Sequence, residues 1–146
     1  MEAKVTWEKE LSFMGVADSG YPIKMDSESS TERGAGPMEM LGMALAACTA
    51  MDVISILLKK QQKVTYFEVK FHGERAKEHP RRLVKGVLDY VVKGRKVEEK
   101  AILRAIELSL TKYCSVHATL HNAFPLDLHY SIYEDDELIK QGVYQL

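Results

Sequence analysis

The segment that most constrains the fold runs from Gly36 to Leu58 and has helix-forming residues throughout. Gly36 can cap the helix, Pro37 suits its first turn, and Glu39 complements the positive end of the helix dipole. Beyond that turn almost every face is apolar, and the exceptions are Thr49, Asp52 and Ser55. A helix on a protein surface normally has a polar half. We therefore expect a second subunit to bury part of this helix.

The remaining elements predict an α+β protein built on antiparallel sheet, in one domain over residues 1–146. Short strands with turns fill the first 26 residues, with one turn at Asp18-Ser19-Gly20, and a small polar loop spans 27–36. The acidic tail, 134–146, has no assignable role. The elements expected after the long helix are strands at Phe67–His72 and Leu83–Lys93, helices at Val97–Lys112 and Ser115–His121, and a final strand at Leu126–Tyr133.

Composition excludes several classes of protein. The net charge of −1 and the lack of basic clusters disfavour nucleic-acid binding. The N-terminus lacks the basic and apolar regions of a secretory signal. The longest strongly apolar stretch, Met43 to Met51, is shorter than the roughly 20 residues that span a bilayer. We expect a soluble cytoplasmic protein with neither nucleic-acid nor membrane partners.

Cys48 and Cys114 are the two cysteines, and each lies in a helix-forming segment. Their separation of 66 positions excludes a CxxC redox motif. In the reducing cytoplasm a bond between them would be transient. The alternative is that both thiols are buried packing, as unpaired cysteines commonly are. If they are reactive, Cys114 gains help from the start of the following helix, whereas Cys48 lies about three turns inside its helix and needs a cation from elsewhere.

Three motifs in order, PMEMLGMALAACTAMDVISIL, ERAKEHPRR and LSLTKYCSVHATL, resemble the OsmC/Ohr family and most closely its YhfA-like branch of redox proteins. The resemblance implies an intertwined homodimer with antiparallel sheets wrapped around central cysteine-bearing helices. It also implies reduction of organic hydroperoxides or a related oxidised substrate. Cys48 would be the nucleophile, Cys114 would resolve it as a disulfide, and an external dithiol would restore both thiols. We expect neither cofactor nor metal.

The catalytic helpers implied by the resemblance are an arginine and a glutamate. The family places its glutamate directly after the helix-starting proline, where this chain has Met38; Glu39 follows one position later. Nine residues separate Glu39 from Cys48, about 13 Å of helical rise, so Glu39 could act only by orienting an arginine. Arg33 is the nearest cation and the candidate for that role.

Several alternatives remain open at this stage. Asp52, one turn beyond Cys48, is expected to have a structural role and to pair with a backbone group or a cation such as Arg75 or Arg33. Cys114, His117 and His121 have a spacing that could hold a metal, and His117 could instead act as a base for Cys114. The alternative function is a non-catalytic dimer that binds a small hydrophobic ligand or a protein partner where the subunits meet.

Overall fold

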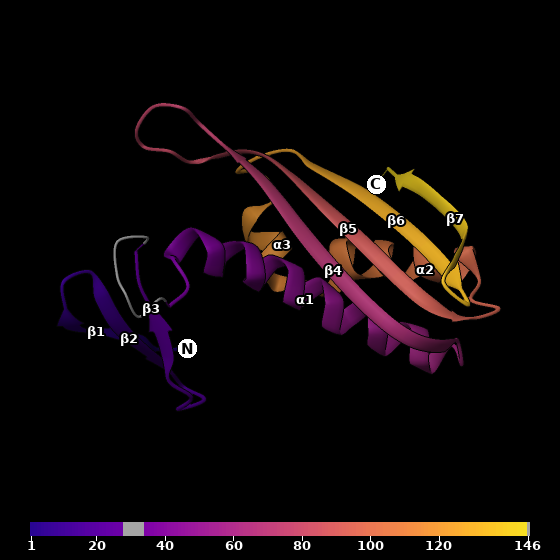
Figure 1. Cartoon of the computed structure of the whole chain (residues 1–146), viewed down its shortest axis with the longest axis horizontal. Helices are drawn as coiled ribbons and strands as arrows, with labels where there is room; N and C mark the ends of the chain where they lie inside the picture. The colour runs from indigo at the N-terminus through magenta and orange to yellow at the C-terminus, as the bar shows by residue number, and fades with distance from the viewer. Residues whose placement is uncertain (28–33, 146) are drawn as a thin grey trace. The chain divides into compact units, whose positions relative to one another are not determined.

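The computed structural model describes residues 1–27 and 34–145 (Figure 1). The chain forms two compact units, Met1–Leu41 and Gly42–Leu146. Each unit has its own sheet, with three strands in the first and four in the second. The single domain expected from the sequence stays a prediction, and part of the expected 27–36 loop lies outside the described residues.

The first unit is an antiparallel sheet of β1 (Ala3–Lys9), β2 (Ser12–Ala17) and β3 (Ile23–Met25), in that order. The predicted turn before β3 is confirmed. Gly20 has a φ of 73°, which glycine adopts without strain, and its N–H donates to the carbonyl of Ala17 at 2.9 Å. Every residue of β1 is exposed, including Val5 and Trp7.

The long helix α1 (Pro37–Lys59) begins where the sequence predicts. The N–H of Met40 donates to the carbonyl of Gly36 at 2.9 Å, which closes the first turn. The N–H of Gly36 in turn donates to Glu39 Oε2 at 2.7 Å, in the manner of a capping box. Glu39 therefore stabilises the start of the helix.

One stripe of α1 is buried within the chain, and its other faces are open. Met43, Met51 and Leu58 keep 53%, 70% and 58% of their surface exposed. This helix is long and apolar enough to cross a bilayer, so the short length of Met43–Met51 does not exclude a membrane span. Core helices of soluble proteins meet the same criteria of length and composition. The buried stripe recurs at helical spacing and consists of Gly42, Leu45, Thr49, Val53 and Leu57.

The second unit is built on a sheet in the order β4, β5, β6, β7. This sheet is mixed, whereas the sequence analysis expected antiparallel pairing. β5 and β6 run parallel because the intervening helices carry the chain back to the starting end of β5. The strands are β4 (Lys63–Arg75), β5 (Leu83–Arg95), β6 (Leu126–Glu134) and β7 (Glu137–Tyr144).

The sequence predicted β6 as the final strand, and this prediction is wrong. The tail folds back as β7 and pairs antiparallel with β6, from Leu128 opposite Tyr144 to Glu134 opposite Glu137. Asp135 and Asp136, both with positive φ, form the tight turn between them. A pair of such residues between two strands is a recognised hairpin signal. Much of the tail, therefore, is an edge strand.

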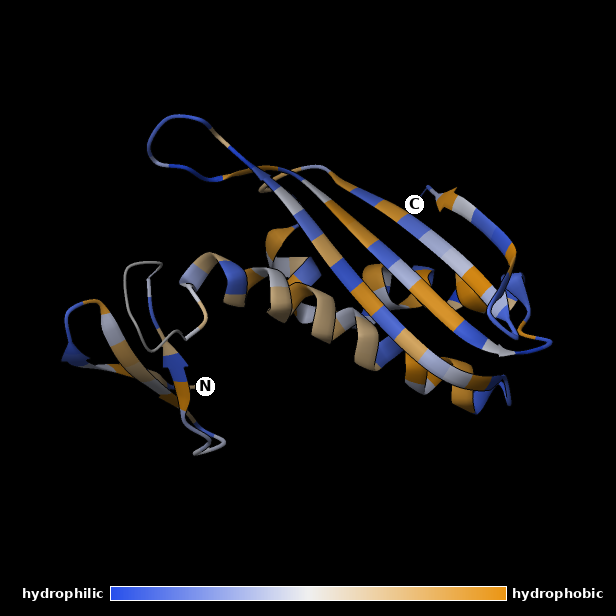
Figure 2. Ribbon diagram, viewed as in Figure 1, coloured by the Kyte–Doolittle hydropathy of each residue, from blue (hydrophilic) through white to orange (hydrophobic). Residues whose placement is uncertain are grey.

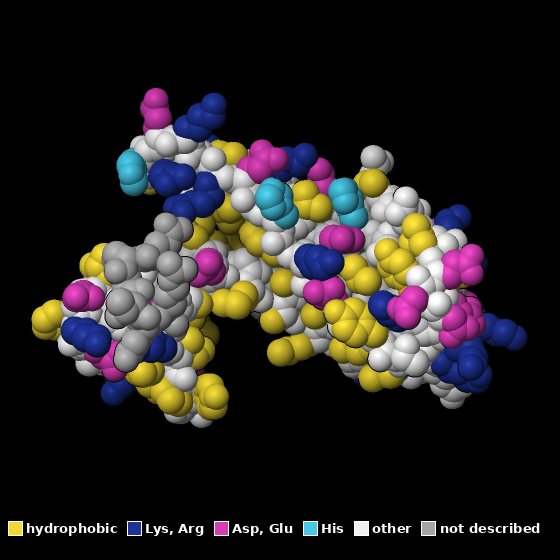
Figure 3. Space-filling model, viewed as in Figure 1, with side chains coloured by type: hydrophobic (Ala, Val, Ile, Leu, Met, Phe, Trp, Pro, Cys, Tyr) yellow, Lys and Arg dark blue, Asp and Glu magenta, His cyan; other side chains and the backbone are white. Residues whose placement is uncertain are grey.

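Three helical segments connect β5 to β6: α2 (Glu99–Leu108), a π-helical turn η1 (Ser109–Tyr113) and α3 (Ser115–Leu120). The predicted single helix over Val97–Lys112 is thus divided at Ser109. Alternate residues of β5 and β6 are buried, among them Leu88, Tyr90 and Leu128, and Figure 2 shows the matching alternation in hydropathy. In the view of Figure 3, acidic and basic side chains are interspersed over this sheet.

Candidate active site

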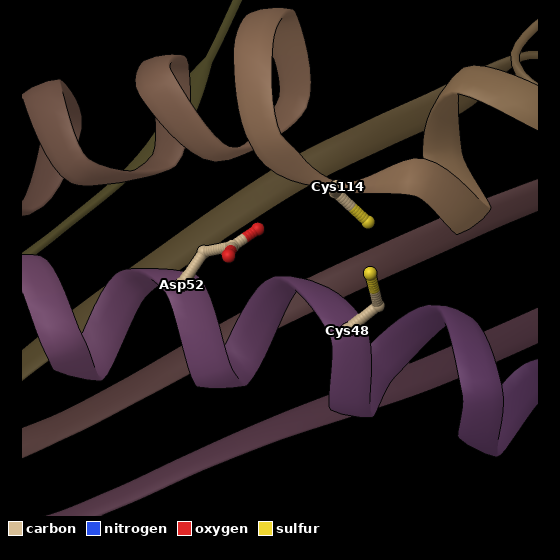
Figure 4. A group of neighbouring side chains, drawn as sticks. All are labelled: Cys48, Asp52 and Cys114. Carbon is tan, nitrogen blue, oxygen red and sulfur yellow. The ribbon is translucent and has the colours of Figure 1, made fainter.

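The two cysteines come together in the second unit. The Sγ atoms of Cys48 and Cys114 and a carboxylate oxygen of Asp52 all lie within 4.8 Å of one another (Figure 4). Cys48 and Asp52 point from α1 toward Cys114, which lies between η1 and α3. The resemblance implied that the cysteine-bearing helices lie at the centre of a homodimer. A single chain is enough to bring the two thiols together.

The two thiols differ in access to solvent. Cys48 is half-buried, on the side of α1 beside the buried stripe. Cys114 keeps 2% of its surface exposed. A reagent from solvent therefore meets Cys48 first.

The π-helical turn positions Cys114. The N–H of Cys114 donates to the carbonyl of Ser109 at 2.8 Å, a bond across five residues that widens the helix. Cys114 then has an extended backbone, with φ −71° and ψ 99°, and caps α3. The carbonyl of Leu110 is bonded to Nδ1 of His117 at 2.9 Å, so the break in the helix leaves this carbonyl satisfied.

Two opposing effects act on the Cys114 thiol. As the sequence predicts, the start of α3 helps: the N–H of His117 donates to Cys114 Sγ at 3.3 Å, which lowers the pKa. Burial outweighs it, because a thiolate loses its hydration inside the protein. Burial, the hydrogen bond to Cys48 and the charge of Asp52 together raise the pKa of Cys114 to about 12. Cys114 is therefore a thiol near neutral pH.

The greater exposure of Cys48 and the raised pKa of Cys114 predict the order in which the two thiols are alkylated in reduced, metal-free protein. Because burial and the neighbouring groups raise the pKa of Cys114, only a very small fraction of its side chains are thiolates at pH 8. Iodoacetamide should modify Cys48 first, and the Cys114 rate should rise about tenfold per pH unit up to the limit of protein stability. Mass spectrometry of a Cys48→Ser variant isolates the Cys114 reaction. Faster labelling of Cys114 than of Cys48 at pH 8 would contradict this order.

Asp52 ends a buried chain of hydroxyl groups. Ser109 Oγ lies 2.9 Å from Asp52 Oδ2 and 3.0 Å from Thr49 Oγ1, which is 2.8 Å from the hydroxyl of Tyr90. A hydroxyl has one proton and an ionised carboxylate only accepts. Ser109 therefore donates to Asp52, Thr49 to Ser109, and Tyr90 to Thr49.

Ser109 satisfies Asp52 where the sequence analysis expected a backbone group or a cation. The Nε of Arg75 instead donates to the carbonyl of Arg81 at 2.7 Å. Sequence reasoning missed Ser109 and Tyr90 in this network. Thr49 was visible as a polar exception in the apolar helix, but its partners are 41 and 60 positions away along the chain.

The other candidate residues lie apart from the sulfurs or outside the description. Glu39 is exposed in the first turn of α1 and caps Gly36, so a catalytic role for it stays a prediction. Arg33 lies outside the described residues. His117 contacts Cys114 through its backbone N–H while Nδ1 of its ring is bonded to Leu110. In the described part of the chain, Cys114 groups with Cys48 and Asp52 as potential metal ligands, and His121 is not among them.

Comparison with known proteins places this chain in a family. The family model of OsmC-like proteins matches residues 29–129. Protein YhfA of Escherichia coli strain K12 is 41% identical over 132 residues, which cover 90% of this chain and 98% of YhfA. A hypothetical protein from Aquifex aeolicus VF5 has a crystal structure that superposes with a TM-score of 0.82 at 31% identity, over 92% of this chain and 96% of that one.

A more distant structure shares the fold alone. The organic hydroperoxide resistance protein from Elizabethkingia anophelis superposes with a TM-score of 0.66 at 12% identity, over 91% of this chain and 94% of that one. Because the family model covers most of the chain and YhfA matches nearly its full length, the resemblance carried by the three sequence motifs is confirmed. The chain belongs to the family of OsmC-like proteins.

Proposed function

We propose that this protein is a thiol-dependent redox enzyme that reduces organic hydroperoxides, or a related oxidised substrate, through a Cys48–Cys114 dithiol–disulfide cycle. The observation that carries the proposal is the approach of the two sulfurs to within 4.8 Å in one chain. Family membership and the fold shared with an organic hydroperoxide resistance protein support a peroxide-related function.

The first step belongs to Cys48, because its sulfur is the more accessible of the two. Its thiolate attacks the O–O bond of ROOH and takes one oxygen. Cys48 becomes a sulfenic acid, and the other fragment takes a proton and leaves as ROH. In this proposal Arg33 and Glu39 keep the helper roles implied by the resemblance.

The second step joins the two sulfurs. The thiol of Cys114 displaces water from the sulfenic acid of Cys48, so one S–S bond forms and one S–O bond breaks. To form the disulfide, the two sulfurs must approach from within 4.8 Å to about 2.05 Å. Asp52 is close enough to accept the proton that Cys114 loses. An external dithiol then reduces the disulfide and becomes a disulfide itself.

Reduced protein treated with cumene hydroperoxide tests this function. Each chain should consume one peroxide, release cumyl alcohol, lose both free thiols and become two hydrogens lighter, and peptide mapping should identify the Cys48–Cys114 bond. Cumyl alcohol in place of the peroxide is the matched control and should leave both thiols free. Two free thiols after prolonged excess peroxide would overturn the proposal.

The proposed enzyme is a cytoplasmic homodimer in which a second copy covers the open faces of α1. Met43, Met51 and Leu58 on α1 are large apolar side chains left exposed by one chain. Such an apolar surface is typical of a protein–protein interface. An apolar helix of this length predicts that a second copy of the chain covers its exposed faces.

Met51→Glu is expected to convert the dimer into a monomer, because it puts a charge in the centre of this apolar surface. Ile139→Glu, on edge strand β7, is the matched control, since Ile139 is also exposed, at 55% against 70% for Met51. Light scattering coupled to size-exclusion chromatography measures both masses. A dimeric Met51→Glu protein, or a monomeric wild type, would contradict this assembly.

A further inference from the structure

We infer that Cys48, Asp52 and Cys114 form a binding site for one divalent cation that prefers sulfur ligands, such as Zn²⁺. The inference goes beyond the proposed peroxide chemistry and does not depend on it. It also departs from the sequence analysis, which expected no metal and considered a different set of ligands around Cys114.

The ligand atoms have the number, type and spacing of a metal site. Two cysteine sulfurs and one carboxylate oxygen all lie within 4.8 Å of one another. In a tetrahedral site with Zn–S bonds of about 2.3 Å, two sulfurs are about 3.8 Å apart, so the two sulfurs need to approach each other by at most about 1 Å. Sulfur ligands favour zinc and other soft ions over magnesium and calcium.

The scaffold presents the three ligands from two sides. Cys48 and Asp52 are four residues apart on α1 and so project from one face, one turn apart. Cys114 faces them from the junction of η1 and α3 (Figure 4). Three protein ligands of this kind leave a fourth tetrahedral position for water or a small molecule.

Hydrogen bonds from neighbouring groups hold the ligands in place. The hydroxyl of Ser109 donates to Asp52 Oδ2 at 2.9 Å and is itself held by Thr49. The other carboxylate oxygen of Asp52 has no hydrogen bond recorded among the described residues, so it is available to a metal. The His117 N–H directed at Cys114 Sγ is a further outer-shell contact. Metal ligands in proteins are typically oriented by such partners.

The charge of the site favours a cation. All three ligands are acidic groups, and among residues 1–27 and 34–145 neither a lysine nor an arginine forms an ion pair or hydrogen bond with any of them. Without a metal Cys114 is an uncharged thiol, and ionising the thiols beside Asp52 is costly unless a positive charge compensates them. A divalent ion supplies that charge, and its binding releases the two thiol protons. Because the metal then binds both sulfurs, peroxide cannot oxidise the metal-bound protein.

Cobalt(II) is a suitable probe because it takes zinc-like tetrahedral sites and absorbs light. Reduced, EDTA-treated and desalted wild-type protein, titrated without oxygen, should bind one cobalt per chain. A sulfur-to-cobalt charge-transfer band should appear in the near ultraviolet, and one equivalent of zinc should abolish it. Zinc-loaded protein should also keep both thiols when peroxide is added.

Variants assign the ligands. Cys48→Ser and Cys114→Ser should each remove the charge-transfer band of the two-sulfur site, and Asp52→Asn should weaken cobalt binding at least tenfold. Ser109→Ala, which removes only the outer-shell donor, should weaken it by about tenfold or more. His121→Gln is the control and should bind as the wild type does, because its ring Nδ1 is bonded to the carbonyl of Ala118. Far-ultraviolet circular dichroism confirms that each variant is folded.

Three results would overturn the site: no charge-transfer band in the wild type, a band unchanged in folded Cys48→Ser protein, or loss of binding in His121→Gln. The titration contains no peroxide, so its result is separate from the test of the enzyme. Protein that binds cobalt but leaves hydroperoxide intact supports the metal site alone. Protein that reduces hydroperoxide but binds no cobalt refutes the metal site alone.

Discussion

Cys48→Ser protein is expected to consume cumene hydroperoxide no faster than buffer does. Serine cannot replace the thiolate as an attacking group at neutral pH, and Cys114 is 2% exposed, so it cannot take over the first step. The change removes one sulfur from a half-buried position and should leave the fold intact. A peroxide-consumption assay on reduced protein with an external dithiol measures the loss.

Cys114→Ser is the matched variant, because it removes the other sulfur and preserves the nucleophile. We expect one peroxide consumed per chain, followed by slow turnover, since the sulfenic acid of Cys48 then lacks its resolving partner. A dimedone adduct on Cys48 would report that sulfenic acid. If Cys48→Ser protein instead consumes peroxide at the wild-type rate, the cysteines are packing residues and the non-catalytic alternative is favoured.

Leu88→Ala is expected to lower the free energy of unfolding by about 2–5 kcal/mol, the usual cost of emptying a fully buried leucine site. Leu88 is 0% exposed in the centre of the sheet, opposite Phe71 of β4 on one side and Leu128 of β6 on the other. Those neighbours are fixed by strand pairing and cannot easily close the cavity. Urea unfolding followed by circular dichroism measures the change.

Leu138→Ala is the control for this substitution. Leu138 lies on edge strand β7 and is 42% exposed, so the same loss of atoms should cost about 0.5 kcal/mol or less. Both variants must be compared at one protein concentration, because association contributes to apparent stability. Equal losses for the two variants would contradict the burial of the β5 core.

The elements with strong local signals were predictable from sequence. α1 starts as expected because Gly36, Pro37 and Glu39 each favour a helix start by a local mechanism that needs no other part of the chain. The short strands around Gly20 were likewise visible, since a glycine turn between alternating segments is a local pattern. The family resemblance rested on motifs in the sequence itself, so it needed no coordinates.

The features missed depend on distant parts of the chain. The π-helical turn at Ser109 breaks a segment whose helical periodicity continues beyond this residue. The geometry of the turn includes a hydrogen bond between the ring of His117 and the carbonyl of Leu110. β7 has weak alternation of its own and is held by pairing with β6. The parallel pairing of β5 and β6 follows from the path of the helices between them. None of these has a strong periodic signal in the sequence.

The candidate site was predicted in part. Both cysteines were chosen from sequence, and their partnership came from the resemblance, but their meeting within one chain depends on how η1 turns Cys114 toward α1. Asp52 was noticed as a costly carboxylate in an apolar helix. Its position beside both sulfurs, and its bond from Ser109, are tertiary features that spacing along the chain does not contain.

The proposed chemistry requires the sulfurs of Cys48 and Cys114 to be neighbours in the same chain. The most direct test oxidises an equimolar mixture of co-refolded Cys48→Ser and Cys114→Ser proteins with diamide, beside the wild type. We predict that each oxidised wild-type chain has no covalent bond to another chain and is two hydrogens lighter, with its Cys48–Cys114 bond confirmed by peptide mapping, and that the mixture forms no disulfide between chains. A covalent Cys48–Cys114 dimer in the mixture, or two unpaired thiols in the oxidised wild type, would contradict it.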